Sequence, residues 1–316
     1  MVLMGSMLLV SNIIALMLAA PFQQAGYDQS FENPDDPVNP LIYVAFLLVF
    51  SALLLFILKK KKGAPLRYFI YFAFGMLLFY VLFIPYIYIF YYAFGIRGAV
   101  IGNMALLAAI ITSVVVMAIY AMKRVWYVTN GVGVLVAAGA IGLFGVNFSI
   151  LPTFLFLAAL ALYDYIAVYK TKHMLTLADG VLALDVPIML SVPKKGAAKS
   201  SKHLRPKISI KESLEKGVER DAMYMGLGDV IIPGVLVVSA LSFLPYHISM
   251  GLWGARIVAL GTLAGILASY VALSFLVMKG KPQAGLPFLN TGAIAGYIVS
   301  YIIVYQNVTL GMVFSW

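Results

Sequence analysis

Long apolar runs, separated by short polar stretches, recur along the whole chain. A helix needs about twenty apolar residues to cross the roughly 30 Å hydrocarbon core of a bilayer. Runs of about this length predict nine transmembrane helices, over residues 3–20, 41–58, 68–94, 99–122, 128–146, 148–169, 222–244, 251–278 and 286–305. The predicted fold class is an all-α polytopic membrane protein.

The polar stretches divide the chain into three parts. Residues 1–169 form a predicted six-helix N-terminal part, residues 170–221 a large loop, and residues 222–316 a three-helix C-terminal part. Within the loop, residues 194–216 are rich in Lys, Ser and Gly, which is typical of a flexible linker. Residues 181–190 differ, because they are apolar, broken by a proline and too short to span a membrane; they favour a surface segment or a strand.

Composition supports the membrane assignment and excludes several chemistries. The chain of 316 residues is 63% hydrophobic and 11% charged, which is more apolar surface than a water-soluble core can bury. Cysteine is absent, so the chain has no disulfide, thiolate ligand or cysteine nucleophile. Its three His residues are too few and too scattered for a His-based metal site, and because the sequence offers no ligand cluster we predict no metal and no cofactor.

Positive charge follows the predicted loops. The formal net charge is +10, yet all of the 22 Lys and Arg residues except Arg97 and Arg256 come after even-numbered spans. By the positive-inside rule those loops are cytoplasmic. The N-terminus and the 170–221 loop then face the cytoplasm, and the C-terminus faces outside. A nucleic-acid partner is not expected, because the sequence shows no basic face on a soluble domain.

The first apolar run allows two interpretations. Leu18-Ala19-Ala20 at its end resembles a signal-peptidase site, but no Lys or Arg precedes the run as in a typical signal peptide. We favour a retained transmembrane helix. Removal of this run would leave the sidedness of the other spans unchanged.

Two aspartates lie inside predicted spans. Of the twelve acidic residues, only Asp164 and Asp229 do so. A carboxylate at the centre of a bilayer costs about 2.5–3.5 kcal/mol on insertion scales, so both positions call for a function. Asp164 lies near the end of one span and Asp229 near the start of the next. Because consecutive spans are antiparallel, we expect both side chains at the same depth.

Two carboxylates at one depth can carry acid–base chemistry. At about 5 Å they would repel by roughly 3 kcal/mol at an effective dielectric near 20, so the pair would hold one proton between them. One carboxylate can then take a proton from water while the other donates one, as in aspartic proteases. Gly226 and Gly228 next to Asp229 carry no side chains that would block backbone or substrate.

Position alone leaves other functions open. The same two aspartates suit a proton- or cation-conducting transporter or leak channel, or hydrogen bonds with a purely structural role. A catalytically inactive scaffold is a further alternative. A proton carrier would be expected to show a path of polar groups and an internal repeat, and the sequence shows neither.

Three short motifs resemble those of a known family. Tyr163-Asp164, Gly226-Leu227-Gly228-Asp229 and Ala284-Gly285-Leu286-Pro287 are similar, in order and spacing, to the YD, GxGD and PAL signatures of presenilins and signal peptide peptidases. The family has Pro-Ala-Leu where this chain has Ala-Gly-Leu followed by proline. We expect small residues and a proline to oppose a helix there.

The resemblance implies a function and a set of site residues. It implies an intramembrane aspartyl protease that cleaves within transmembrane helices of its substrates, with Asp164 and Asp229 as the catalytic pair. The residues expected to shape the site or bind substrate around them are Tyr163, Gly226, Leu227, Gly228, Gly285, Leu286 and Pro287. Tyr163 is expected to position Asp164.

The basic loops place the chain with presenilins, whose central loop is cytoplasmic, and this implies substrates with their N-terminus outside. Short loops and compact length look most like an archaeal presenilin homologue in the cell membrane, without obligatory partner subunits. A homo-oligomer and self-cleavage in the central loop stay open.

A helical substrate hides its scissile carbonyl in hydrogen bonds, so it must unwind before water attacks. We predict that residues 181–190 and the chain before Gly226 form cytoplasmic strands, with which an unwound substrate pairs. The alternative role for these segments is a plug at the membrane surface.

Overall fold

The computed structural model describes residues 1–27, 33–59, 63–123, 125–170, 188–193, 222–245, 251, 253–278 and 284–312. Its elements are α1 (Val2–Gln24), α2 (Val38–Lys59), α3 (Gly63–Tyr92), α4 (Ala99–Met122), α5 (Trp126–Asn147), α6 (Ile150–Tyr165), the π-helical turn η1 (Ile166–Lys170), β1 (Met189–Pro193), β2 (Ala222–Gly226), α9 (Leu227–Phe243), α10 (Trp253–Met278) and α11 (Gly285–Tyr305). The predicted linker at 194–216 lies outside the described residues.

The helices have the length and composition of membrane spans. Within the described ranges, seven helices are long and apolar enough to cross a membrane, and two shorter apolar helices cover Val38–Leu53 and Leu227–Phe243. The predicted helix at 99–122 coincides with α4. A helical, polytopic membrane fold is therefore confirmed.

The seventh predicted span is wrong at its start. Residues 222–226 form strand β2, and the helix begins only at Leu227. β2 pairs antiparallel with β1, with Met189 opposite Gly226 and Pro193 opposite Ala222, so the ladder satisfies backbone groups that a helix would otherwise satisfy. Apart from this two-stranded sheet, the described elements are helical, in line with the predicted fold class. A strand before Gly226 is confirmed, whereas β1 starts at Met189, near the end of the predicted 181–190 strand, and 181–187 lie outside the described residues.

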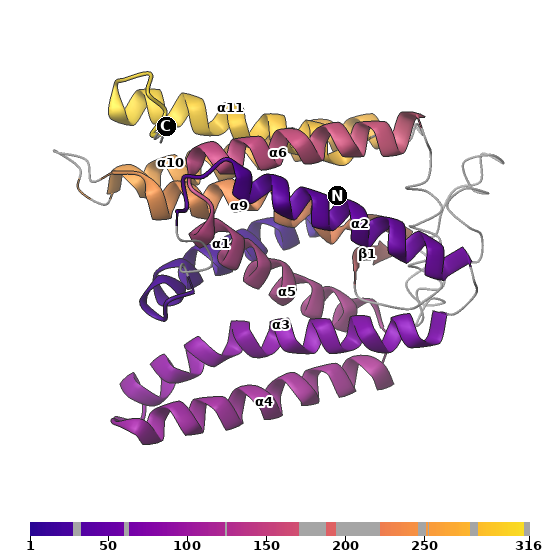
Figure 1. The fold of residues 1–316 in the computed structure, drawn as a ribbon, viewed down its shortest axis with the longest axis vertical. Coiled ribbons are helices and arrows are strands. Elements are labelled where there is room, and N and C mark those ends of the chain that lie inside the picture. The colour runs from indigo at the N-terminus through magenta and orange to yellow at the C-terminus, as the bar shows by residue number, and fades with distance from the viewer. Residues whose placement is uncertain are drawn as a thin grey trace.

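Helix α9 lies at the centre of the bundle. It packs against α1, α5, α6, α10 and α11. In Figure 1, α3 and α4 run side by side along one side of the molecule, while α6, α10 and α11 lie on the opposite side. Because α9 is surrounded by helices, its middle, residues 235–238, is fully buried.

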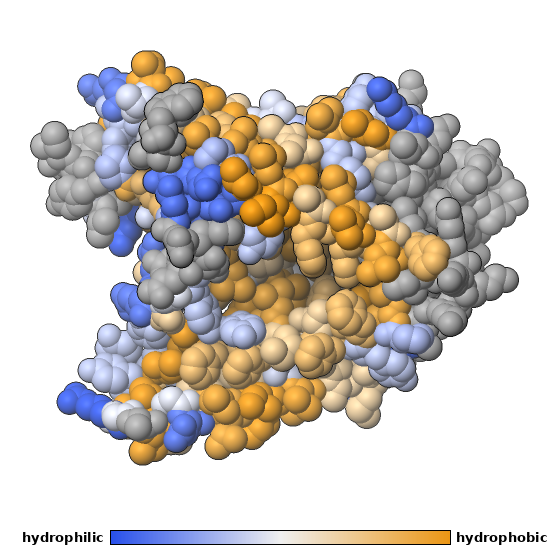
Figure 2. All heavy atoms as spheres, in the orientation of Figure 1, coloured by the Kyte–Doolittle hydropathy of each residue, from blue (hydrophilic) through white to orange (hydrophobic). Residues whose placement is uncertain are grey.

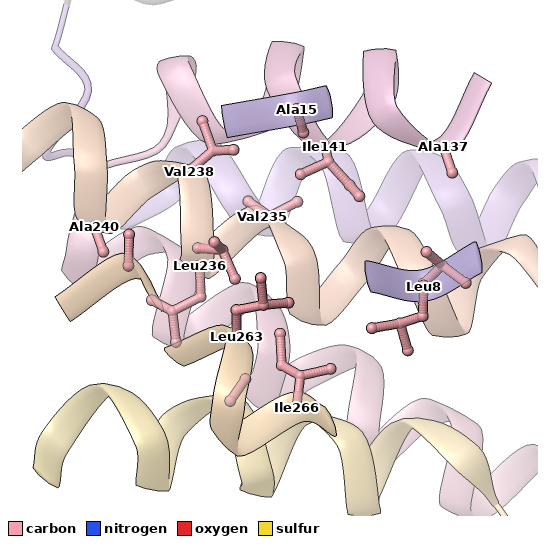
Figure 3. Close-up of a cluster of buried hydrophobic side chains, with 14 of the residues drawn as sticks. Leu8, Ala15, Ala137, Ile141, Val235, Leu236, Val238, Ala240, Leu263 and Ile266 are labelled. Carbon is pink, nitrogen blue, oxygen red and sulfur yellow. The ribbon is translucent and has the colours of Figure 1, made fainter. Parts of the chain in front are cut away.

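The core around α9 is made of small and branched apolar side chains. Figure 3 shows side chains of α1, α5, α9 and α10 converging there, among them Leu8, Ile141, Val235 and Ile266. Helix α1 is thus one of the core helices, and Phe22 near its end is fully buried too. This packing favours the interpretation of the first run as a helix of the bundle.

The outer surface is apolar, as expected for lipid contact. Phe46 and Val49 on α2 and Leu107, Ile111 and Val114 on α4 are all exposed. Exposed apolar area on this scale is unusual for a protein in water and normal for one in a bilayer. Figure 2 also shows that the visible face is hollowed between α2 and α3 and that apolar residues line the hollow.

Candidate active site

Asp164 lies in the last turn of α6 and is buried, with 5% of its surface exposed. Its Oδ2 atom accepts a hydrogen bond from the backbone N–H of Leu286, in the first turn of α11, at 3.2 Å. Directly after Tyr165 the α-helix changes into the π-helical turn η1. Single π-helical turns are often found at functional sites, because the wider turn redirects the side chains beside it.

Asp229 is the third residue of α9, whose N-cap residue is Gly226. Its carboxylate accepts a hydrogen bond from the backbone N–H of Gly226. This is one half of a capping box, in which the third helical residue reaches back to the N-cap. The negative charge also lies at the positive end of the α9 dipole, which is favourable. The Gly-x-Gly-Asp sequence therefore starts this helix and fixes its aspartate at the same time.

The first turn of α11 lies between the two aspartates. A Cβ atom on Gly285 would lie 3.1 Å from both carboxylate oxygens of Asp229. The next residue, Leu286, donates its N–H to Asp164. The two carboxylates therefore approach the same short backbone segment. The structure thus places Asp164 and Asp229 beside the start of the same helix, α11, and their common depth in the membrane stays a prediction.

The start of α11 has no capping side chain of its own. Its N-cap residue, Ala284, offers no oxygen. Instead, the N–H of Ala284 donates to the Tyr169 hydroxyl at 3.4 Å, and the N–H of Leu286 donates to Asp164. Side chains from η1 and α6 thus satisfy amides that every helix leaves unpaired at its start. These two hydrogen bonds hold the end of α6 and η1 against the start of α11.

The expectation that residues 284–287 oppose a helix is wrong. Helix α11 begins at Gly285, with Pro287 in its first turn. Proline is tolerated there because the first-turn N–H groups have no partner within the helix, so losing one costs no hydrogen bond. The motif keeps its place beside the aspartates, but as a helix start.

The remaining expected site residues lie around this centre. Leu227 and Leu286 are buried, with 4% and 8% of their surface exposed, and pack into the core. Gly228 lies on the exposed side of the first turn of α9, and a Cβ atom there would meet only Ile232, at 3.7 Å. The space beside Gly228 is therefore open for another molecule to approach.

Tyr163 connects α6 to another helix. Its hydroxyl forms a hydrogen bond with the Ser51 hydroxyl on α2, at 3.1 Å. This side chain ties α2 to α6 one residue before Asp164. The expectation that Tyr163 positions Asp164 stays a prediction, and the contact with Ser51 offers a way to test it.

Two polar residues near the site escaped the sequence analysis. Tyr169 holds the start of α11, and Asn290, one turn further along α11, donates its amide to the Leu157 carbonyl of α6 at 2.8 Å. Tyr169 was indistinguishable from an interfacial aromatic residue. Asn290 is a polar residue inside an apolar run, and this pattern alone could have marked it as a residue that contacts another helix. Among the described residues, no group of three or more His, Asp or Glu could hold a metal ion.

Comparison with known proteins assigns the family. The family model described as signal-peptide peptidase, presenilin aspartyl protease matches residues 5–305. A presenilin family intramembrane aspartate protease, solved in space group C222, shares 33% identity with a TM-score of 0.65, covering 95% of this chain and 98% of that one. A presenilin family intramembrane aspartate protease solved in space group P2 shares 32% identity with a TM-score of 0.63, covering 95% of this chain and 96% of that one.

A mammalian relative matches over a shorter stretch. Signal peptide peptidase of Mus musculus is 28% identical over 125 residues, which span 39% of this chain and 28% of the mouse protein. Since the family model covers nearly the whole chain, the protein belongs to the presenilin and signal peptide peptidase family of intramembrane aspartyl proteases, multi-pass membrane enzymes that act on transmembrane substrates. This membership favours a protease over a transporter.

Proposed function

We propose that Asp164 and Asp229 are the catalytic pair of this intramembrane aspartyl endopeptidase. The observation that carries the proposal is that both carboxylates flank the Gly285–Leu286 backbone, one through a hydrogen bond and the other through close contact. The approach of two carboxylates from separate helices to one segment of a third helix supports a shared water molecule between them.

The proposed reaction is hydrolysis of a peptide bond. One carboxylate removes a proton from water as its oxygen attacks the scissile carbonyl carbon, while the protonated partner donates to the carbonyl oxygen. The resulting diol collapses as the carboxylate that had donated its proton takes one from a diol hydroxyl, the C–N bond breaks, and the other carboxyl group passes its proton to the leaving nitrogen. The reaction ends with a new acid, a new amine and the pair restored.

The remaining site residues are proposed to shape the cleft. Gly226 and Gly228 leave room for substrate backbone beside Asp229. Gly285 allows α11 to approach the same carboxylate, and Leu227, Leu286 and Pro287 form the walls. A substrate helix has to unwind, and we propose that its extended segment pairs with the β1–β2 sheet, which leads directly into α9.

The proposed topology has nine spans, with the N-terminus and the 170–221 loop in the cytoplasm and the C-terminus outside. The Lys and Arg residues of alternate loops support this orientation. We further propose that the chain acts in the cell membrane of an archaeon, without obligatory partner subunits, on substrates whose N-terminus is outside.

The test uses the purified full-length protein in detergent with a peptide that contains one transmembrane span. Products are identified by mass spectrometry for the unchanged protein and for Asp164→Asn, Asp229→Asn and Asp35→Asn. The last variant is a matched control, because Asp35 lies in the loop between α1 and α2. We expect cleavage within the span, lost in both dyad variants and kept in the control.

Cleavage that survives either dyad substitution would contradict the assignment of that residue. If no cleavage occurs but reconstituted liposomes show a proton or cation flux that depends on Asp164 or Asp229, the transporter alternative would replace the proposal.

A further inference from the structure

Asn130, in the second turn of α5, forms two hydrogen bonds with one residue of β1. Its Nδ2 donates to the Ser191 carbonyl at 2.7 Å, and its Oδ1 accepts from the Ser191 N–H at 2.9 Å. Both residues are buried, each with 3% of its surface exposed. A carboxamide that bonds both backbone groups of one residue reproduces the pattern by which a neighbouring strand would pair.

The register of the sheet shows which edge Asn130 occupies. Leu227 donates its N–H to the Ile188 carbonyl at 3.0 Å, which makes these two residues a hydrogen-bonded pair. In an antiparallel ladder such pairs alternate, so the backbone groups of Ser191, opposite Tyr224, point away from β2. Without Asn130, a buried N–H and C=O on the outer edge of β1 would lose their partners, at a cost of about 1–3 kcal/mol each.

This sheet is connected to Asp229 without any intervening loop. β2 ends at Gly226, whose N–H donates a hydrogen bond to the Asp229 carboxylate, and α9 begins at the next residue. Helix α5 also packs along α9, where Gly145 faces Val238 and the Val235 carbonyl. One helix therefore holds both the sheet before Asp229 and the helix that carries it.

We propose that Asn130 is a positioning residue of the protease: its carboxamide acts as a third strand on β1 and sets the position of the sheet, and through it of Asp229. The proposal rests on the proposed function, because it assigns Asn130 a part in cleavage. It also implies that a substrate strand extends the sheet on the side away from Asn130.

Asn130→Leu tests the proposal, since leucine keeps the approximate volume but forms no hydrogen bond. The matched control is Asn147→Leu, at the other end of α5, where the Asn147 amide donates to the Tyr27 carbonyl at 2.7 Å. Asn147 is also buried, and it is the last residue of α5, whereas Asn130 lies near the start of that helix. Both variants are made in the full chain and compared at equal amounts of folded protein.

Two readouts separate positioning from general stability. Because small displacements of reacting groups cost rate, we expect kcat of Asn130→Leu to fall about 10- to 100-fold with KM within about twofold. Amide hydrogen exchange across residues 223–227 is expected to speed up about tenfold, since the ladder loses its support on one side. Asn147→Leu should change neither.

Unchanged exchange at residues 223–227 in Asn130→Leu would overturn the proposal, as would an equal loss of kcat in both variants. The exchange measurement does not depend on turnover. If the unchanged protein shows no cleavage, the proposed function fails, whereas faster exchange would still support the structural half of this inference and unchanged exchange would reject it.

Discussion

The Oδ2 atom of Asp164 accepts a hydrogen bond from the N–H of Leu286 at 3.2 Å and so caps a helix to which Asp164 does not belong. In most helices a Ser, Thr, Asp or Asn at the N-cap position provides this oxygen. Here the N-cap is Ala284, and the oxygen comes from α6. The Asp164 carboxylate, which is proposed to act on substrate, therefore also holds the start of α11 in place. The hydrogen bond between Asp164 and Leu286 thus keeps α11 beside the proposed catalytic pair.

The first prediction concerns the size of residue 285. A Cβ atom on Gly285 would lie 3.1 Å from both carboxylate oxygens of Asp229, which alanine can relieve by a shift of a few tenths of an ångström. Valine adds two methyl groups at the same point and would displace the carboxylate. We expect Gly285→Ala to lower kcat about threefold and Gly285→Val about 100-fold or more, measured by peptide cleavage.

Gly102→Val is the control for this series. A Cβ atom on Gly102, in α4, would meet nothing within 4 Å, so the side chain can be added without displacing a neighbour. Full activity of Gly285→Val would show that α11 does not lie against Asp229 during catalysis.

The second prediction concerns Tyr163 and Ser51. If the hydroxyl of Tyr163 serves mainly to tie α6 to α2, then Tyr163→Phe and Ser51→Ala should have similar effects, and the double variant should be no worse than either. Polar contacts between membrane helices average about 0.6 kcal/mol, so each change in the free energy of unfolding should be of that order. Thermal unfolding in detergent measures it.

Cleavage rates test the alternative role of Tyr163, which is to position Asp164 directly. If the hydroxyl positions Asp164 directly, Tyr163→Phe should lower kcat strongly while Ser51→Ala leaves it near the unchanged value. Equal kcat in the two variants would reject that role.

The third prediction concerns Asn290, which is 2% exposed. Its amide donates to the Leu157 carbonyl, while its own Oδ1 has no hydrogen-bond partner in the described structure. Asn290→Leu loses one hydrogen bond but also removes an unpaired oxygen, so we expect a change within about 1 kcal/mol. Asn290→Asp would place a carboxylate in the same dry position, and we expect a loss of about 3 kcal/mol or more unless it binds a proton. Chemical unfolding in mixed micelles compares the two. A more stable Asn290→Asp would contradict the position of this side chain.

The fourth prediction concerns Tyr169, whose hydroxyl accepts from the Ala284 N–H at 3.4 Å. The bond is long, so its loss in Tyr169→Phe should be mild, with a fall in kcat of about threefold and little change in stability. Tyr165→Phe is a matched control, since the Tyr165 ring lies 5.0 Å from the Tyr169 ring, centroid to centroid, in a tilted arrangement, and Tyr165 is half exposed. Both variants keep the aromatic ring, so a larger effect in Tyr165→Phe would contradict a specific part for the Tyr169 hydroxyl.

The sequence by itself predicted a helical membrane protein and singled out Asp164 and Asp229 as candidate site residues. Apolar length is a local property of the chain, and the 99–122 prediction therefore matched α4 at both ends. A carboxylate inside an apolar run is likewise visible in the sequence alone, so Asp164 and Asp229 stood out without any structure. Their family motifs then named a chemistry that the comparisons support.

Tertiary structure alone decided how these residues are held. Residues 222–226 are a strand because β1 is available to pair with them, and a hydrogen-bond partner from a distant part of the chain leaves no trace in local hydropathy. The bonds of Asp164 to Leu286, Asn130 to Ser191 and Tyr169 to Ala284 each join separate elements. Hydrophobic patterning places helices in a membrane, but only the packing of one helix against another decides which polar groups meet.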